Sequence, residues 1–449
     1  MHARSTQPEG NAASSLGACV PPTPAHPRRS RAWADRTCPR GSPSQKAPSN
    51  SDHGRSRRTR SARRIRRATA PTSSRSTSSP CASARPSSSR SSGPPGAARA
   101  PTRADPDPAD LARAIGLIAS SKRMVLWVGG GAVQSEAGQA ITELAERLAA
   151  PVIATWAGRG VVPAGHPWSV DLPPHEPAVA ALLADADLMI AIGTEFDGPN
   201  TKNWSMPRPP ALISINADPV DVAKNFLPDI AIVADARTTV LALLDRIEKR
   251  EGDPPNPELA ADERTTTAMA LVTAVNSAVE RHDATVVNDM AIAGYWVGGY
   301  GRFAAPRRMQ YPVGWGTLGY ALPAAVGVGA THDRPMLAIC GDGGFMFAVG
   351  ELAVLVEQRM PVTVLLVDDG GYGMLRFDQD HTGTARRGVD LVRPDFLALA
   401  TAFGIPAAES TLDELADALD TALEANEPRL VLLKESLYPP RTISARWSE

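Results

Sequence analysis

The sequence has few cysteines and no long apolar run. Three of its four cysteines, Cys19, Cys38 and Cys81, lie near the start of the chain, and Cys340 ends an apolar stretch. This spacing excludes a disulfide framework and a CxxC zinc site. The longest apolar stretches run to about ten residues, short of the ~20 that a membrane-spanning helix needs, and no signal peptide opens the chain. We expect a soluble, cytoplasmic protein with no membrane partner.

The first 105 residues also lack acidic and large apolar side chains. They hold 19 Arg and one Lys against four acidic residues, whereas the other 344 residues hold 27 basic and 44 acidic ones. Their larger apolar residues are only Met1, Leu16, Val20, Trp33 and Ile65. Such a segment cannot bury enough apolar surface to offset the entropy of ordering it. It predicts a disordered, low-complexity Arg/Ser/Pro-rich arm over residues 1–105.

The arm has three interpretations. Arginine clusters such as residues 63–67 neutralise phosphates in nucleic-acid-binding proteins, and the composition also resembles an organelle transit peptide. We favour a third, in which the arm is a GC-rich coding sequence translated out of frame and occupies the place of a domain. Nucleic acid is then not a partner.

Helical and strand periods alternate from residue 106 onward, which favours parallel sheets covered by helices on both faces. The pattern predicts a central domain over residues 106–250, a linker rich in Pro and acids over 251–264, a second domain over 265–440 and a tail over 441–449. The fold class is therefore α/β with two doubly wound parallel-sheet domains. The predicted helices are 109–118, 136–149, 178–183, 238–249, 266–279, 317–330, 347–359, 395–403 and 412–425. The predicted strands are 124–128, 151–155, 188–192, 211–215, 230–233, 284–287, 335–340, 361–367 and 429–434.

Two glycine-rich turns with acids follow consecutive predicted strands of the second domain. The first reads Gly-Asp-Gly-Gly over residues 341–344, and the second reads Asp-Asp-Gly-Gly-Tyr-Gly over 368–373. Neighbouring parallel strands end at the same edge of a sheet, where ligands bind in open α/β folds. Glycines there let backbone N–H groups approach an anion. An Asp would repel a bare phosphate, so the pair predicts a Mg²⁺ ion that bridges carboxylates and a diphosphate.

These turns, with GGYGMLR over residues 370–376 and GWGTLGYALPAA over 314–325, resemble the signatures of thiamine-diphosphate-dependent enzymes. The resemblance extends over nearly all of the chain from residue 106 and is most like the large subunit of acetolactate synthase. It implies that Asp342, Asp369 and the carbonyl of Gly371 bind Mg²⁺; at 369 the family usually has an amide. It also implies contacts to thiamine diphosphate, with Leu318 propping the thiamine. The cofactor-binding residues would be Gly341, Gly343, Gly344, Leu318, Met290 and Met374.

Other positions differ from acetolactate synthase. Residues 288–291 lack the polar side chains that hold phosphate in those enzymes, so their backbone N–H groups would serve instead. Asp378 stands where those enzymes carry a Trp near the substrate. His381 is either a proton shuttle or a solvated loop residue, and Glu351 is taken as a helix-start or interface residue. The glycines at 129–131 make FAD a candidate cofactor, although Gln134 breaks the GxGxxG pattern.

The resemblance implies a small 2-oxo acid as substrate, its decarboxylation or carboligation, a role in branched-chain amino acid biosynthesis, and a homo-oligomer whose active site spans two subunits. The family also needs a Glu in a pyrimidine-binding N-terminal domain, and the arm offers only Glu9. No catalytic residue is therefore assignable, and we expect the isolated chain to be inactive. The alternatives are a benzoylformate-decarboxylase-like enzyme and a non-catalytic cofactor-binding remnant.

Overall fold

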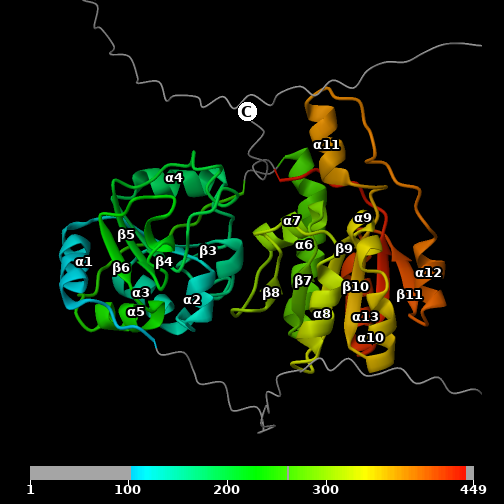
Figure 1. Cartoon of the computed structure of the whole chain (residues 1–449), viewed down its shortest axis with the longest axis horizontal. Helices are drawn as coiled ribbons and strands as arrows, with labels where there is room; N and C mark the ends of the chain where they lie inside the picture. Colours follow the sequence, from blue (N-terminus) through cyan, green and yellow to red (C-terminus); the bar gives the residue numbers. More distant parts are fainter. Residues whose placement is uncertain (1–102, 260–261, 441–449) are drawn as a thin grey trace, which may run out of the picture. The chain divides into compact units, whose positions relative to one another are not determined.

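The computed structural model describes residues 103–259 and 262–440. The expected arm, apart from residues 103–105, and the tail over 441–449 lie outside the described residues. Helices and strands alternate along the described chain (Figure 1). They form two six-stranded sheets in which every neighbouring pair is parallel, as the alternation predicts.

The first sheet has the strand order β3-β2-β1-β4-β5-β6. Its central strands β1 and β4 read MVLWV and LMIAI, and all ten residues are buried, as in strands covered on both faces. The strands are β1 (Met124–Val128), β2 (Val152–Ala154), β3 (Ser169–Val170), β4 (Leu188–Ile192), β5 (Ala211–Asn216) and β6 (Ile230–Val233). The helices are α1 (Pro108–Ser120), α2 (Gly130–Gln134), α3 (Gly138–Leu148), η1 (Trp156–Gly158), α4 (Pro177–Asp185), η2 (Asp221–Ala223) and α5 (Ala236–Leu244).

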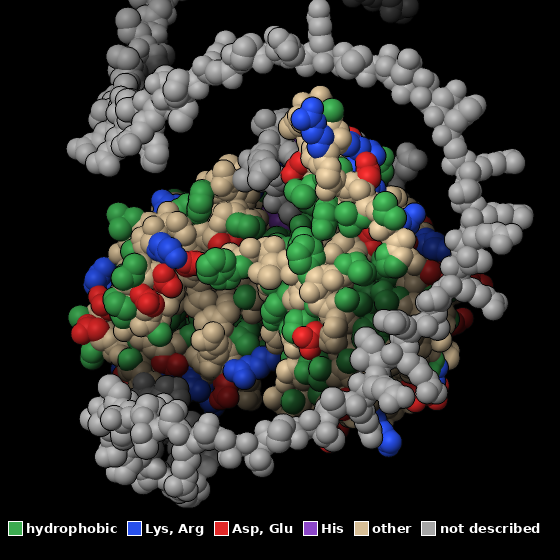
Figure 2. All heavy atoms as spheres, turned by 45° about the vertical axis from the view of Figure 1, so that its right-hand side comes forward, with side chains coloured by type: hydrophobic (Ala, Val, Ile, Leu, Met, Phe, Trp, Pro, Cys, Tyr) green, Lys and Arg blue, Asp and Glu red, His purple; other side chains and the backbone are tan. Residues whose placement is uncertain are grey.

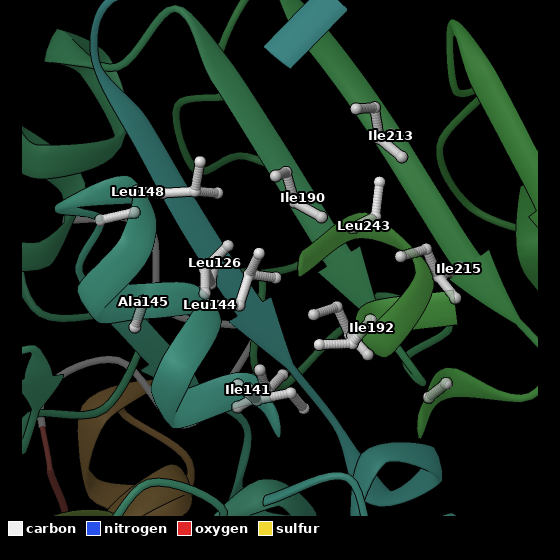
Figure 3. Close-up of a cluster of buried hydrophobic side chains, with 14 of the residues drawn as sticks. Leu126, Ile141, Leu144, Ala145, Leu148, Ile190, Ile192, Ile213, Ile215 and Leu243 are labelled. Atoms are coloured by element: carbon white, nitrogen blue, oxygen red, sulfur yellow. The ribbon is translucent and has the colours of Figure 1, made fainter. Parts of the chain in front are cut away.

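Alternate residues of these strands face two separate cores. Leu126 of β1 packs with Ile190 of β4 and with the apolar stripes of α1, α3 and α5 (Figure 3). Trp127, the next residue, points to the other face and packs with Val179 and Leu183 of α4. The first sheet is therefore covered on both faces, as a doubly wound fold requires.

The second sheet has the strand order β11-β12-β10-β9-β7-β8. Along the chain the order reverses direction between β7 and β9, so these neighbours form a topological switch point. Its strands are β7 (Thr285–Asn288), β8 (Met309–Gln310), β9 (Met336–Gly341), β10 (Val362–Val367), β11 (Ala407–Ser410) and β12 (Arg429–Leu433). Its helices are α6 (Glu263–His282), α7 (Ile292–Tyr300), α8 (Ala321–Gly329), α9 (Asp342–Phe347), α10 (Glu351–Gln358), α11 (Gly373–His381), α12 (Phe396–Ala402) and α13 (Leu415–Glu424).

This sheet is also covered on both faces. Ile339 of β9 packs in a core with residues of α6, α7 and α13, whereas its neighbour Cys340 packs with residues of α8, α10 and α12. Cys340 is a free, fully buried thiol, which agrees with its expected place in an apolar strand. Burial raises the pKa of this thiol well above its usual value.

Several element boundaries differ from the expectation. The helix expected over residues 317–330 begins four residues later, at Ala321, because Gly319 has a φ of +75° that no helix continues. The helix expected over 347–359 is α10, which begins four residues later, at Glu351, and a separate helix, α9, precedes it. Helix α6 begins inside the expected linker, at Glu263. Several elements were not predicted, because they are short, rich in glycine or partly polar. They are helices α2, α7, α9 and α11 and strands β3, β8 and β11.

Candidate functional site

A cavity of about 200 Å³ lies where β7, β9 and β10 end. Its lining comes from the segments that follow these strands and from residues 316–318. Because β7 and β9 flank the switch point, their following loops diverge and leave space for a ligand. The sequence therefore places its two acid-bearing turns at the position where open α/β sheets bind ligands.

All nine residues predicted for the cofactor and metal line this one cavity. They come from four segments that are far apart in the sequence. The expected cofactor contacts are Met290, Leu318, Gly341, Gly343, Gly344 and Met374, and the expected metal ligands are Asp342, Asp369 and Gly371. The structure thus brings the predicted residues together, while their roles remain predictions.

The carboxylates of Asp342 and Asp369 are buried or half-buried, and each is incompletely hydrogen-bonded among the described residues. Asp342 is 1% exposed, and neither of its carboxylate oxygens has a hydrogen-bond partner among the described residues. Oδ1 of Asp369 is likewise buried, without a hydrogen-bond partner among the described residues. Burial, and then the neighbouring carboxylates of Asp369 and Asp368, raise the pKa of Asp342 to about 7. Burial also raises the pKa of Asp369.

This arrangement fits a hard divalent cation. Mg²⁺ takes one or two carboxylates together with phosphate oxygens and water, and two carboxylates with one backbone carbonyl match that donor set. Among the described residues there is no group of three or more His, Cys, Asp or Glu side chains that could hold a metal. A Mg²⁺ site here therefore needs the Gly371 carbonyl and a ligand's own oxygens.

Two arginines accompany the paired aspartates. Arg393 Nη1 donates to both carboxylate oxygens of Asp368 at 2.8 Å. Arg376 Nη1 donates to the backbone carbonyl of Asp369 at 2.9 Å, and its Nη2 lies 3.6 Å from Oδ1 of the same residue. Arg376 thus places a positive charge beside the carboxylate that stands where the family usually has an amide.

Glycine is required at two positions of the cavity wall. A Cβ at Gly343 would lie 2.6 and 2.7 Å from ring carbons of Tyr372. Gly371 has a φ of +150°, and a Cβ there would lie 2.0 Å from the carbonyl oxygen of Val389. Glycine lets the Gly343 backbone lie this close to the Tyr372 ring and the Gly371 backbone this close to that of Val389. The cover that the Tyr372 ring provides over Gly343 was not predicted from the sequence.

The expectation for residues 288–291 is wrong in one respect. Their backbone N–H groups were expected to hold a phosphate, but the structure uses three of them internally. The N–H of Asp289 donates to Ile339, that of Met290 to the Asp289 carboxylate, and that of Ala291 to the Asp289 carbonyl. Met290 keeps its side chain on the cavity.

Helix α11 carries the residues expected near the substrate. Met374 and Leu375 line the cavity from its first turn, and Asp378 follows Met374 by four residues, on the same helix face. Burial, and then the Asp378 carboxylate, raise the pKa of Tyr295, another lining residue, to about 12. His381 is exposed and is the last residue of α11, with its ring stacked on Phe377.

Glu351 lies outside this cavity. It is the first residue of α10, and the lining does not include it. The expectation of a helix-start residue is therefore confirmed. A carboxylate in the first turn is stabilised by the positive end of the helix dipole.

A second cleft, of about 750 Å³, lies at the switch point of the first sheet, beside residues 129–131 and 193–195. A Cβ at Gly129 would lie 2.3 Å from the carbonyl oxygen of Gly193, so loop packing already explains the glycines. The lining carries five carboxylates, and its one basic residue, Arg103, already contacts Asp235 and Glu136. The described lining therefore has no basic side chain that is not already paired with an acid and could bind the diphosphate of FAD. Because packing explains the glycines, they are not evidence for FAD.

Two further features concern the surface charge and the length of the helices in the described part of the chain. On the visible described part of Figure 2, acidic and basic side chains are interspersed without a broad basic area. The arginine clusters that suggested nucleic acid lie outside the described residues. No helix among the described residues is long and apolar enough to cross a membrane.

Comparisons with known proteins agree with this site. Residues 111–243 match the family model of the thiamine pyrophosphate enzyme central domain, and residues 289–433 match that of the C-terminal TPP binding domain; thiamine pyrophosphate is thiamine diphosphate. Over 335 residues the chain is 35% identical to a probable 2-ketoarginine decarboxylase of Pseudomonas aeruginosa, covering 71% of this chain and 59% of that protein.

Two further proteins extend the comparison. The acetolactate synthase of Mycobacterium avium is 30% identical over 347 residues, covering 70% of this chain and 55% of that protein. The solved structure of benzoylformate decarboxylase from Polynucleobacter necessarius superposes with a TM-score of 0.64 at 25% identity, covering 77% of this chain and 68% of that one. The chain thus spans less than two thirds of the curated relatives named here. It belongs to the family of thiamine-pyrophosphate-dependent enzymes, close to the large subunits of acetolactate synthase.

Proposed function

We propose that this chain is the cofactor-binding part of a Mg²⁺- and thiamine-diphosphate-dependent enzyme that decarboxylates a small 2-oxo acid. One observation carries the proposal above the others. Asp342 is buried at the end of β9 with both carboxylate oxygens unpartnered, and it lines a cavity beside Asp369. A buried carboxylate without a partner is costly unless a cation completes it.

The chain's own residues would divide the binding work. Asp342, Asp369 and the Gly371 carbonyl would hold Mg²⁺, and the turn of Gly341, Gly343 and Gly344 would face the diphosphate. Thiamine, when bound, supplies the carbanion chemistry that removal of CO₂ from a 2-oxo acid needs. The apolar lining beyond the turn would orient the thiamine and exclude water. It comprises Met290, Ile292, Leu318 and Met374.

The fate of the decarboxylated substrate separates two candidate activities. The similarity to acetolactate synthase supports carboligation with a second 2-oxo acid. The similarity to a 2-ketoarginine decarboxylase and to benzoylformate decarboxylase supports simple decarboxylation. Asp378 stands where acetolactate synthases carry a Trp, so this side of the substrate region differs from theirs, and the difference supports the second candidate.

The working form is proposed to be a homo-oligomer. In the family the Glu that activates thiamine comes from a pyrimidine-binding domain across a subunit interface, and we assign no described residue to that role. We therefore propose that the isolated chain binds Mg²⁺ and the diphosphate end of the cofactor without turnover. A non-catalytic remnant would behave in the same way and differs only in failing to gain activity from a partner. FAD has no part in this proposal.

Calorimetry and CO₂ release together test the proposal. The full chain is titrated with thiamine diphosphate with and without Mg²⁺, and CO₂ release is measured from pyruvate, benzoylformate and 2-ketoarginine. The chain is then mixed with an acetolactate synthase subunit whose own metal-binding Asp is replaced, so that the subunit can lend only its Glu. Mg²⁺-dependent binding with CO₂ release in the mixture supports the function. CO₂ release by the chain alone overturns the proposal that the isolated chain is inactive. Cofactor binding without CO₂ release, both by the chain alone and in the mixture, indicates the non-catalytic remnant. Absence of Mg²⁺-dependent binding overturns the whole proposal.

A further inference from the structure

Asp289 is a buried carboxylate at the end of β7 for which the proposed chemistry has no use. It is 1% exposed. Its Oδ1 accepts the N–H of Met290 at 2.7 Å and that of Gly319 at 3.0 Å, and its Oδ2 lies 3.5 Å from the N–H of Ala321. Its bonds to residues 319 and 321 therefore reach a segment thirty positions away in the sequence.

Helix α8 explains why a carboxylate is favourable there. The first turn of a helix leaves backbone N–H groups without intrahelical partners. Tyr320, the residue before α8, makes no side-chain capping bond. Asp289, at the end of β7, supplies the missing acceptor. Its negative charge also interacts favourably with the positive end of the α8 dipole. The late start of α8, which the apolar pattern does not predict, coincides with this contact.

The same carboxylate lies between three parts of the cavity wall. It precedes Met290, and it binds the N–H of Gly319, directly after Leu318, whose side chain lines the cavity. On the third side is Gly344 of the diphosphate turn, where an added Cβ would lie 3.2 to 3.3 Å from the carboxylate of Asp289. No other described side chain is shown bonding both the segment after β7 and the segment before α8.

We propose that Asp289 is a positioning residue, which fixes the Leu318 segment against the diphosphate turn so that the thiamine end of the cofactor is held in place. The proposal rests on the function proposed above, because it assumes that thiamine diphosphate occupies this cavity. It predicts an asymmetry between the two ends of the cofactor. Loss of Asp289 weakens the binding of the thiamine end but not the binding of the diphosphate end.

The asymmetry can be measured without turnover. Affinities for Mg²⁺-pyrophosphate and for Mg²⁺-thiamine diphosphate are determined by calorimetry for the full chain, Asp289→Asn and Asp289→Ala. The Asn variant keeps one acceptor oxygen but turns an NH₂ group toward backbone donors, so its effect is the smaller one. We expect Asp289→Ala to lower the affinity for Mg²⁺-thiamine diphosphate by about tenfold or more, which is the range for the loss of hydrogen bonds to a charged acceptor. Pyrophosphate affinity stays within about twofold or rises, since a nearby negative charge has been removed.

Asp395→Asn is the matched control. Asp395 accepts the N–H of Ala398 at 3.0 Å and caps α12, and it does not line the cavity. This variant removes a capping carboxylate and one negative charge, and it should change neither affinity nor their ratio. An Asp289 variant in which both affinities fall in parallel, or in which neither falls, overturns the positioning role.

Hydrogen exchange of the ligand-free chain tests the contact independently of the cofactor. We expect the amides of Gly319 and Ala321 to exchange about tenfold or more faster in Asp289→Ala, with the amides of α12 unchanged. Unchanged exchange at Gly319 overturns the inference whether or not the cofactor binds. If the wild-type chain binds neither pyrophosphate nor thiamine diphosphate, the proposed function and the cofactor-positioning role both fail, even where the exchange result shows the contact.

Discussion

Arg393 binds the carboxylate of Asp368, and its Nη1 lies 2.8 Å from each of the two oxygens. This contact separates the roles of the two consecutive aspartates. Asp368 is tied to the guanidinium and does not line the cavity, whereas Asp369 lines it with a buried oxygen, Oδ1, that has no hydrogen-bond partner among the described residues and lies 3.6 Å from Arg376. The sequence motif presents two carboxylates, and the structure directs only one of them, that of Asp369, to the cavity.

Asp342→Asn is therefore expected to impair Mg²⁺ binding far more than Asp368→Asn. Replacing groups that only support metal ligands costs ~10- to 100-fold in affinity, so removing the Asp342 charge should cost at least about 100-fold. Calorimetric titration of Mg²⁺ in the presence of pyrophosphate measures both variants. The metal assignment is refuted if Asp368→Asn has the larger effect or if Asp342→Asn binds normally.

Asp369→Asn should be the mildest of the ligand changes. The amide keeps an oxygen donor and restores the residue type usual in the family, while Arg376 beside it loses its partner charge. We expect Mg²⁺ affinity in the presence of pyrophosphate to fall by no more than about tenfold. Asp369→Ala, which removes the donor, is the comparison. Equal losses in the two variants would mean that the side-chain oxygen at 369 is not a ligand.

Gly343→Ala should block the cavity, because its Cβ would overlap the Tyr372 ring. Binding of Mg²⁺-pyrophosphate is expected to fall by about tenfold or more as the turn or the ring is displaced. The double variant Gly343→Ala/Tyr372→Ala removes the clash and should recover most of the loss. Failure of the double variant to recover binding would contradict the steric explanation.

Gly327→Ala is the control for that substitution. Gly327 is exposed in α8, and a Cβ there meets nothing within 4 Å. The change should leave pyrophosphate binding alone and stabilise the fold by about 1 kcal/mol through helix propensity. Thermal unfolding with and without ligand separates this effect from that of Gly343→Ala.

Most of the fold could be predicted, because buried parallel strands are continuous apolar runs. The strand of Leu126 and that of Ile190 are predicted at their observed bounds, residues 124–128 and 188–192. Helix α7 could not be predicted from its pattern, since all nine of its residues are buried and no polar face reveals a period. The start of α8 follows Gly319, whose φ is +75°, and coincides with the bonds from Asp289, a contact across thirty residues that no local pattern contains.

The site was predicted as a set of positions rather than as a network of contacts. Glycines and aspartates at two strand ends, with the family resemblance, identified Asp342 and Asp369. The partners that decide their environment, Arg393 and Arg376, come from irregular sequence and from an ordinary helix position. The ring of Tyr372 over Gly343 depends on how two loops meet, which spacing alone does not encode.

His175 gives the fold a specific sensitivity to acid. It is 4% exposed, and neither ring nitrogen has a hydrogen-bond partner among the described residues. Burial, and then the nearby charges of Arg159 and Lys202, lower its pKa from 6.5 to about 3. Below pH 6.5, His175 therefore binds a proton in the unfolded chain but stays neutral in the folded chain until the pH approaches 3. Stability is unaffected above pH 6.5 and falls with pH below it, by up to about 1.4 kcal/mol per pH unit.

His175→Phe should remove this dependence. The ring nitrogens make no hydrogen bond that phenylalanine would lose, and an aromatic ring beside Trp156 is retained. Urea unfolding at pH 7, 6, 5 and 4 should show a shallower loss of stability for His175→Phe than for the wild type, with little difference at pH 7. His332→Gln, at a partly exposed position after α8, should keep the wild-type slope. Parallel slopes for the wild type and His175→Phe would show that His175 takes up a proton in the folded protein after all.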